Sequence, residues 1–374
     1  MNEEKGRWLK ERLEEIRSLR EYRAGETLGR AAQKSRVKPS EILKLNSNEN
    51  FFVPRETLTR LLREVAEEVD LRIYPQEEER EIKEALGEYL GVPSKCIMME
   101  SGSDPLIAFL SSLFLEQGDE ALSVEPTFGI YKHVVDLTGA RYLSVPLRED
   151  FSMDIGKILA KVTPRTKLFF LCSPNNPTAN QFKIDEIRSL IEEFPGIVII
   201  DEAYGEFADY TTVPLVEKFE NLMVLRTFSK TFGLAGLRLG YAVANPELAT
   251  TLSEKAQLPY PVSSIALRMG LKLLANIEIV KDAIGRLKRE RGRLIGELNA
   301  IEGVTAFDSQ ANFVLFQTEK ESNKIYQVLL DNGVLVRNFG RVLHLERCLR
   351  TTVGLPEMNE KTLAVLKQVF GEQR

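Results

Sequence analysis

Residues 222–238 read LMVLRTFSKTFGLAGLR, and the lysine in this stretch, Lys230, decides how the chain is interpreted. The apolar run Leu222–Leu225 predicts a buried strand that ends shortly before the lysine. The loop after this strand would carry an amine, hydroxyl groups and Arg238, between apolar flanks that do not suit a solvated surface. An amine can form a Schiff base with an aldehyde, and hydroxyls and an arginine can hold a phosphate. The stretch therefore predicts a site for a phosphorylated aldehyde.

The composition excludes several other classes of site and partner. The chain of 374 residues is 43% hydrophobic and 28% charged, which is ordinary for a globular protein with room for two domains. Its net charge of −5 gives no reason to expect nucleic acid or an anionic membrane as a partner. With three scattered cysteines and two histidines, we expect no disulfide framework, no metal site and no Ser-His-Asp triad. The first residues lack the apolar core of a signal peptide, so a cytoplasmic location is expected.

Short apolar runs alternate with amphipathic stretches between Ile97 and Asn245, and this pattern predicts an α/β fold. The alternation favours a mostly parallel sheet with helices on both faces. The expected strands are Glu120–Val124, Lys167–Cys172, Gly196–Ile200, Asn221–Leu225 and Leu239–Val243.

The segments on either side of this region predict further parts. The C-terminal part predicts a smaller α+β domain. Its expected elements are a helical stretch over Ser264–Leu298, three strands near 312–317, 333–337 and 349–353, and a last helix from Asn359. Residues 3–20 carry apolar side chains at helical spacing, which favours an amphipathic helix packed on the body or on a partner. We therefore divide the chain into an N-terminal helical arm (1–45), a large cofactor-binding domain (46–262) and a small domain (263–374).

Ligands of open α/β sheets lie beyond the carboxyl ends of the strands, and three further segments place polar residues there. Asp201 ends an apolar run, and a protonated pyridine nitrogen would suit a buried carboxylate and make the ring an electron sink. Asn176 and Tyr204 could both donate to the phenolic oxygen of such a ring. Gly102-Ser103-Asp104 precede the apolar helix Leu106–Leu115, whose first N–H groups favour phosphate. Taken singly, each segment is as readily a turn or a helix cap; together they predict pyridoxal phosphate.

With these residues in view, the chain resembles the class I and II aminotransferases, which are pyridoxal phosphate enzymes of fold type I. Six motifs occur in that superfamily's order between about Tyr22 and Thr352: Gly102-Ser103-Asp104, Pro126-Thr127-Phe128, Asn176-Pro177, Asp201-Glu202-Ala203-Tyr204, Ser229-Lys230 and Gly236-Leu237-Arg238. Within it the chain is most similar to the histidinol-phosphate aminotransferase family, on residues 45–50 (LNSNEN), 74–75 (YP), 172–178 (CSPNNPT), 225–230 (LRTFSK), 259–263 (PYPVS) and 348–354 (CLRTTVG). The resemblance implies a large domain with a seven-stranded sheet. It also implies transfer of an amino group from histidinol phosphate to 2-oxoglutarate in histidine biosynthesis.

The resemblance also implies a role for each candidate residue. Lys230 would bond to the cofactor and act as a base, Asp201 would pair with the ring nitrogen, and Phe128 would stack on the ring. Asn176 and Tyr204 would hold the phenolic oxygen. The cofactor phosphate would contact Gly102, Ser103, Asp104, Thr227, Ser229 and Arg238, and Tyr74 would reach it from the second subunit of a homodimer. The residues that would contact the substrate are Tyr22, Asn48, Arg337 and Arg350, with Arg350 at an α-carboxyl group and Arg337 at a distal phosphate.

Two departures from the family pattern and two alternative activities accompany this interpretation. Ala179-Asn180 follow Asn-Pro-Thr where the family usually has glycine, and Phe51 replaces a proline in a loop near the substrate. Arg337 could instead be a surface arginine at the end of a strand. The alternatives are an aminotransferase for aromatic or many amino acids and a threonine-phosphate decarboxylase on the same scaffold. A cofactor-sensing regulator is disfavoured, because no basic helix-turn-helix precedes Tyr22.

Overall fold

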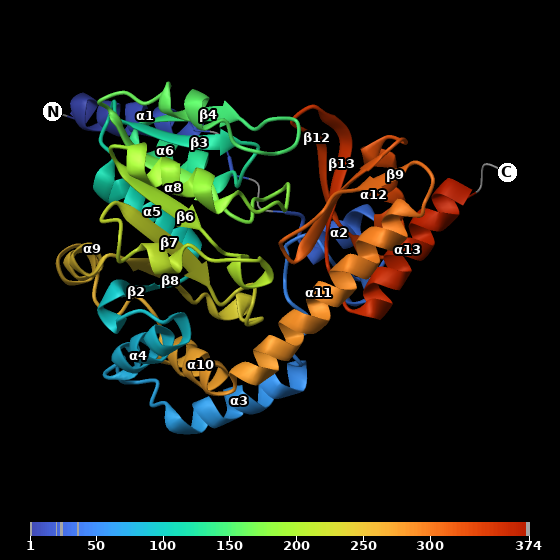
Figure 1. Cartoon of the computed structure of the whole chain (residues 1–374), viewed down its shortest axis with the longest axis horizontal. Helices are drawn as coiled ribbons and strands as arrows, with labels where there is room; N and C mark the ends of the chain where they lie inside the picture. The colour runs from blue at the N-terminus through green and yellow to red at the C-terminus, as the bar shows by residue number, and fades with distance from the viewer. Residues whose placement is uncertain (1, 20, 23–24, 36, 372–374) are drawn as a thin grey trace.

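The computed structural model describes residues 2–19, 21–22, 25–35 and 37–371, without the side chains of residues 2–5. A seven-stranded sheet forms one side of the molecule and a four-stranded sheet the other (Figure 1). The seven strands have the order β2-β8-β7-β6-β5-β3-β4. Their bounds are β2 Ile97–Glu100, β3 Glu120–Glu125, β4 Arg141–Pro146, β5 Thr166–Cys172, β6 Ile197–Asp201, β7 Leu222–Thr227 and β8 Gly240–Ala244.

The sheet is mostly parallel, as predicted, and β8 is the strand that runs against both of its neighbours. The five predicted strands all form, with ends that differ by one or two residues. Two strands were missed for local reasons. Strand β2 has only four residues, and β4 lies at the edge of the sheet, where partly exposed residues interrupt the apolar run.

Helices cover both faces of this sheet because its strands are apolar on both sides. In β5, Phe170 packs in a cluster that includes helices α5 and α6, whereas its neighbour Phe169 packs in a second cluster that includes α8. The helices associated with the large sheet are α3 Arg55–Glu68, α4 Glu78–Leu90, α5 Ser103–Phe114, α6 Ile130–Thr138, α7 Ile155–Leu159, α8 Ile184–Glu193, α9 Pro246–Thr251 and α10 Ser264–Ala275.

The C-terminal part is the predicted α+β arrangement. Its antiparallel sheet has the order β12-β13-β10-β9, with β9 Val304–Ala306, β10 Phe313–Thr318, β12 Arg337–Val342 and β13 Leu345–Thr352. Its helices are α11 Ile277–Asn299, α12 Ser322–Asp331 and α13 Pro356–Gly371. The N-terminal segment also contributes, because β1 (Leu43–Lys44) pairs with β11 (Val334–Leu335) and α2 (Leu28–Lys34) lies nearby (Figure 1).

Two predictions about helices need correction. The stretch Ser264–Leu298 is two helices, because the backbone leaves the helical conformation at Asn276 (φ −115°, ψ 37°). Helix α10 packs on α3 and α4, whereas α11 runs across to the C-terminal sheet (Figure 1). Helix α13 begins at Pro356, three residues before the predicted start, and proline suits a first helical turn.

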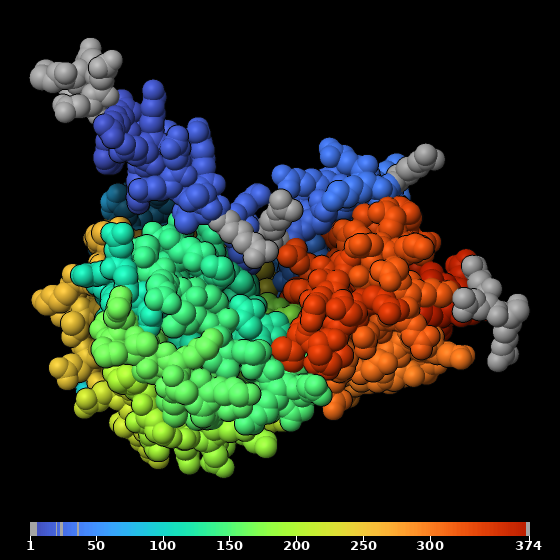
Figure 2. Space-filling view, turned by 90° about the horizontal axis from the view of Figure 1, so that it is seen from above, coloured from blue at the N-terminus to red at the C-terminus, as the bar shows by residue number. Residues whose placement is uncertain are grey.

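Helix α1 (Asn2–Ser18) forms as predicted, but it does not pack on the body. Its apolar side chains stay open to solvent: Trp8 is 68% exposed, and Leu9, Leu13 and Ile16 are exposed as well. Figure 2 shows this helix standing out from the rest of the molecule. Packing on the body was therefore wrong, and packing on a partner stays a prediction.

The carboxyl ends of β5, β6 and β7 meet at one edge of the large sheet, facing the C-terminal part. Cys172 at the end of β5 lies opposite Asp201 at the end of β6, and Asp201 lies opposite Leu225 in β7. The loop with Lys230 follows β7 directly. None of the described helices combines the length and apolar character that crossing a membrane requires.

Candidate active site

A cavity of about 490 Å³ lies at this edge of the large sheet. Residues from both sheets and from the N-terminal segment line it. Of the residues predicted from sequence, the following line the cavity: Tyr22, Asn48, Ser103, Asp104, Phe128, Asn176, Asp201, Tyr204, Thr227, Ser229, Lys230, Arg238, Arg337 and Arg350. Gly102 lies directly behind the wall, against Arg238, and Tyr74 lies outside the cavity of its own chain.

Lys230 brings an amine into the cavity from the loop after β7. Its Nζ donates a hydrogen bond to the backbone oxygen of Ser47 at 2.8 Å. Burial lowers the pKa of Lys230 to about 8, and the nearby carboxylate of Glu49 opposes this shift. An amine with this pKa is partly neutral near neutral pH, so it can act as a nucleophile or as a base.

Asp201 is a carboxylate at the floor of the cavity, 2% exposed. Its Oδ2 accepts from the hydroxyl of Tyr131 at 2.8 Å, and its Oδ1 accepts from the backbone N–H of Ala203 at 3.0 Å. Both donors are uncharged, and burial raises the pKa of Asp201 to about 6. A buried carboxylate with only neutral donors is suited to a cation brought by a ligand, such as a protonated ring nitrogen.

Sequence reasoning missed Tyr131, which lies on α6 and is fully buried. Its ring stacks on Phe170 of β5 at 5.0 Å, and this packing aims the hydroxyl at Asp201. Nothing in the sequence near Tyr131 marks this contact, because it depends on how α6 packs on the sheet.

Tyr204 and Asn176 are each oriented by a second residue of the site. Asn48 donates from Nδ2 to the hydroxyl of Tyr204 at 2.9 Å, and Arg350 donates from Nη1 to Oδ1 of Asn176. Asn48 was predicted to contact the substrate; in the structure its side-chain amide holds Tyr204 in place, and the substrate contact stays a prediction.

The N-terminus of α5 and the loop after β7 together form an anion cradle. Gly102 has a φ of +102°, which residues with a Cβ rarely adopt, and a Cβ there would lie 2.7 Å from Nη2 of Arg238, so a substitution would strain the backbone and displace the guanidinium. Arg238 donates to the Ser229 hydroxyl at 3.2 Å, and the N–H of Ser229 donates to the Thr227 hydroxyl at 3.1 Å. The first turn of α5, from Ser103, adds backbone N–H groups. Guanidinium, hydroxyls and a helix N-terminus are donors that suit a phosphate.

Two arginines lie opposite each other at the other side of the cavity. Arg337 in β12 pairs in register with Arg350 in β13. The guanidinium of Arg350 lies 4.9 Å from the Phe313 ring and 5.4 Å from the Phe339 ring, and that of Arg337 lies 5.9 Å from Phe339. Cation–π contacts of this kind stabilise a cation without neutralising it.

Arg350 is unusually buried for an arginine, at 6% exposed. Burial, together with the positive charge of the neighbouring Arg337, lowers the pKa of Arg350 to about 10, and Tyr204 opposes this shift. Its other hydrogen bond goes to the backbone oxygen of Asn46 at 2.9 Å. Within the described part of the chain its buried Nε has no hydrogen-bond partner. A buried N–H without a partner, beside a second arginine, is suited to an anionic ligand.

The aromatic side chains of Tyr22 and Phe128 form another part of the cavity lining. Phe128 lines the cavity, and its ring meets Tyr22 edge-on at 6.3 Å and Tyr131 edge-on at 5.7 Å. Burial raises the pKa of Tyr22, so its hydroxyl stays a neutral donor. Tyr74, in contrast, is 70% exposed and stacks on Tyr260 at 4.8 Å.

The structure shows where the two departures from the family pattern lie, at Ala179-Asn180 and at Phe51. Ala179 adopts a φ of +63°, so this loop has the positive φ that a glycine would permit, with alanine in its place. Phe51 packs against the hydrophobic core and is not part of the cavity wall.

Comparisons with known proteins agree with this fold and with this site. The model of the family "Aminotransferase class I and II" matches residues 40–368 of this chain. The chain therefore belongs to the class I and II aminotransferase family. As a member it is a pyridoxal-phosphate-dependent aminotransferase, and the anion cradle, the buried carboxylate and the lysine fit that cofactor.

Its curated relatives narrow the family further. The chain is 36% identical to the histidinol-phosphate aminotransferase of Caldanaerobacter subterraneus, over 87% of this chain and 93% of the relative. It is 39% identical to that of Methanosarcina mazei, over 93% of this chain and 94% of the relative.

Solved structures agree on the fold. The histidinol-phosphate aminotransferase of Sinorhizobium meliloti, in complex with pyridoxal-5'-phosphate, superimposes with a TM-score of 0.85 at 24% identity, over 96% of this chain and 97% of that one. The enzyme from Clostridium acetobutylicum gives a TM-score of 0.79 at 25% identity, over 88% of this chain and 99% of that one.

Proposed function

We propose that this aminotransferase transfers the amino group of histidinol phosphate to 2-oxoglutarate, as a cytoplasmic step of histidine biosynthesis. The names of the relatives support this substrate. The observation that carries the proposal is the pair Arg337 and Arg350, opposite each other on adjacent strands and in the same cavity as Lys230. Three buried free cysteines support a reducing location.

The chain's own residues account for cofactor binding in this proposal. Asp201 holds the ring nitrogen, Asn176 and Tyr204 hold the phenolic oxygen, and Phe128 stacks on the ring. The anion cradle formed by Gly102, Ser103, Asp104, Thr227, Ser229 and Arg238 holds the phosphate. When bound, pyridoxal phosphate supplies an aldehyde that bonds to amines and a ring that withdraws electrons from the substrate's α-carbon.

Lys230 moves the proton in this proposal. Its Nζ, partly neutral because burial lowers its pKa to about 8, accepts the proton that leaves the α-carbon of the amino donor. Asp201 keeps its partner nitrogen protonated while charge builds up on the substrate. Because donor and acceptor use the same cavity in turn, ping-pong kinetics are expected.

The two arginines explain how one cavity accepts different anions. Histidinol phosphate carries a phosphate and no α-carboxyl group, whereas glutamate and 2-oxoglutarate carry two carboxylates. A guanidinium binds either kind of anion through two parallel N–H groups. Arg350 would hold an α-carboxyl group where there is one, and Arg337 would hold the distal phosphate or the distal carboxylate.

The proposal includes a homodimer with shared sites. Tyr74 and Tyr260 form an exposed stacked pair outside their own chain's cavity. Leu71, Ile73 and Leu258 are exposed beside them in sequence. Exposed apolar side chains concentrated in two neighbouring loops favour an interface, from which Tyr74 would reach the phosphate site of the other subunit.

A donor panel tests the proposed substrate. The purified enzyme is titrated with histidinol phosphate, phenylalanine, tyrosine and threonine phosphate, and the absorbance of the cofactor is followed. The expected result is the highest kcat/KM for histidinol phosphate. An aromatic amino acid that reacts equally well would indicate a broad-specificity enzyme. Carbon dioxide released from threonine phosphate without an acceptor would indicate the decarboxylase.

A further inference from the structure

A buried cluster of charges lies behind the cavity wall, between the loops that follow β6 and β7. Arg226, four residues before Lys230, is 3% exposed. Its Nε and Nη2 contact Oε2 of Glu202 at 3.0 and 2.7 Å. Its Nη1 contacts Oε1 of Glu206 at 2.7 Å. One guanidinium thus holds two carboxylates that lie on either side of Tyr204 in the sequence.

The cluster also reaches the lysine loop. Thr231, the residue after Lys230, is fully buried, and its hydroxyl donates to Oε2 of Glu206 at 2.6 Å. The backbone oxygen of Thr231 accepts from Nδ2 of Asn50 at 2.8 Å. Unbroken contacts therefore run from the neighbour of Lys230, through Glu206 and Arg226, to Glu202, which follows Asp201.

The loop after β6 has little freedom to shift against this cluster. A Cβ on Gly205 would lie 2.9 Å from Cζ of Arg226, so the backbone at Gly205 lies directly on the guanidinium. The other carboxylate is fully bonded too, because Glu202 accepts from the hydroxyls of Thr211 and Thr212 and from the N–H of Thr212. Buried charges bonded in this way are costly to separate, so the two loops are fixed relative to each other.

We infer that the charge cluster Glu202–Arg226–Glu206 positions Lys230 and Tyr204 for the reaction. None of its three members lines the cavity, so they act through other residues and are positioning residues. A misplacement of about 1 Å in a reacting group can cost up to ~10²-fold in rate, and a base and a hydrogen-bond donor on separate loops need a common support. This inference rests on the roles proposed above for Lys230 and Tyr204.

Two threonines provide a matched test. Thr231→Val and Thr212→Val each remove one buried hydroxyl that donates at 2.6 Å to a carboxylate of this cluster. Of the two, only Thr231 lies in the loop that carries Lys230, so only its hydroxyl ties that loop to the cluster. Both variants are made in the holoenzyme, and the melting temperature, kcat, KM and the circular dichroism of the cofactor's absorption band are measured.

Both variants should show a similar fall in melting temperature. They should differ in kcat and in the circular dichroism of the cofactor's absorption band. Thr231→Val should lower kcat by about tenfold, leave KM within about twofold, and change the cofactor dichroism, because the base is misplaced after binding. Thr212→Val should lower kcat by less than about threefold and change the dichroism less, because Glu202 keeps its bonds to Arg226, to the Thr211 hydroxyl and to the N–H of residue 212. Equal kcat and dichroism in the two variants would overturn the inference.

The variant Arg226→Lys is a second, independent test of the role of the same charge cluster. It keeps the positive charge, but a single ammonium cannot bond to both carboxylates as a guanidinium does. We expect a larger loss of kcat than in Thr231→Val, with the same change in dichroism. If the Arg226→Lys variant does not fold, the comparison of kcat and dichroism between Thr231→Val and Thr212→Val still tests the inference. Full activity of Lys230→Ala would instead contradict the proposed role of Lys230, whatever the threonine variants do.

Discussion

The side of the cavity proposed to hold the cofactor comes from consecutive strands of one sheet, whereas the side proposed to hold the substrate comes from segments far apart in the sequence. Asp201 and Lys230 follow the neighbouring strands β6 and β7. Tyr22, Asn48 and the arginine pair come from the N-terminal segment and from the C-terminal sheet. The cofactor side is therefore fixed by the register of one sheet, and the substrate side depends on how two parts of the molecule meet.

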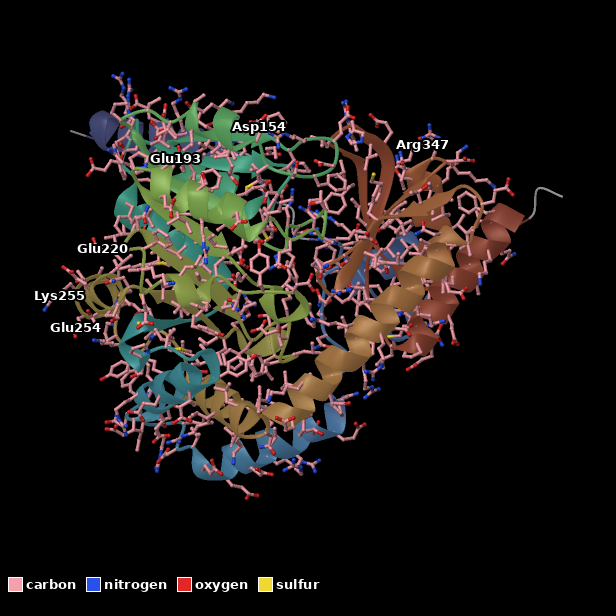
Figure 3. The ribbon with its side chains drawn as sticks, viewed as in Figure 1. Asp154, Glu193, Glu220, Glu254, Lys255 and Arg347 are labelled. Carbon is pink, nitrogen blue, oxygen red and sulfur yellow. The ribbon has the colours of Figure 1, made fainter. Side chains whose placement is uncertain are left out.

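The largest effect should come from the cofactor side. Lys230→Ala removes the amine that we propose as both attachment point and base, so kcat should fall by at least about 10³-fold for every donor. The measurement is the rate of the first half-reaction with histidinol phosphate and with phenylalanine. Lys255→Ala is the control, since Lys255 lies on the outside of the molecule (Figure 3) and its loss should leave both rates unchanged. A loss confined to one donor would argue against a common base.

A somewhat smaller effect should come from the substrate side. Arg350→Ala removes a buried guanidinium that also orients Asn176, so kcat/KM for glutamate and for 2-oxoglutarate should fall by about 10²-fold. Arg347→Ala is the control, because Arg347 lies on the same strand but at the outside of the molecule (Figure 3). The comparison is made by steady-state kinetics with each substrate varied in turn. Equal losses in the two variants would mean that charge on this strand, and not a contact in the cavity, is responsible.

A pH effect on stability isolates the cofactor side. Burial raises the pKa of Asp201 to about 6, above its ordinary value of 3.8. The folded protein without cofactor therefore keeps a proton that the unfolded chain releases, and this contribution to stability is full below about pH 4 and is lost as the pH rises through 6.

The test compares the wild type with Asp201→Asn, both without cofactor, by urea unfolding. Between pH 4 and pH 7 the free energy of unfolding of the wild type should fall by roughly 2 kcal/mol relative to that of the variant. Parallel pH profiles of the two proteins would mean that Asp201 carries its ordinary pKa. Adding pyridoxal phosphate should remove most of the difference, because the ring nitrogen then supplies the missing cation.

The sequence alone predicted the residues next to the strand ends of the large sheet, but it did not predict the contacts that form between distant elements. Strand ends and loop residues such as Asp201 and Lys230 could be placed, because apolar runs mark where a strand stops. Arg337 and Arg350 came from the family resemblance, since their pairing spans a hairpin with irregular register. Contacts such as Tyr131 to Asp201, or the cluster around Arg226, could not be predicted, because they depend on packing between elements that no local pattern records. The domain limits at 45 and 262 stay a prediction.

The proposed substrate is tested most directly by the selectivity of Arg337→Ala between a phosphorylated and an aromatic donor. We expect kcat/KM to fall by about tenfold for histidinol phosphate, which would lose a bidentate phosphate contact, and by less than about threefold for phenylalanine. Half-reaction rates measured for both donors on the same preparation give this ratio. Equal losses for the two donors would contradict the assignment of Arg337 to the phosphate and, with it, the proposed substrate.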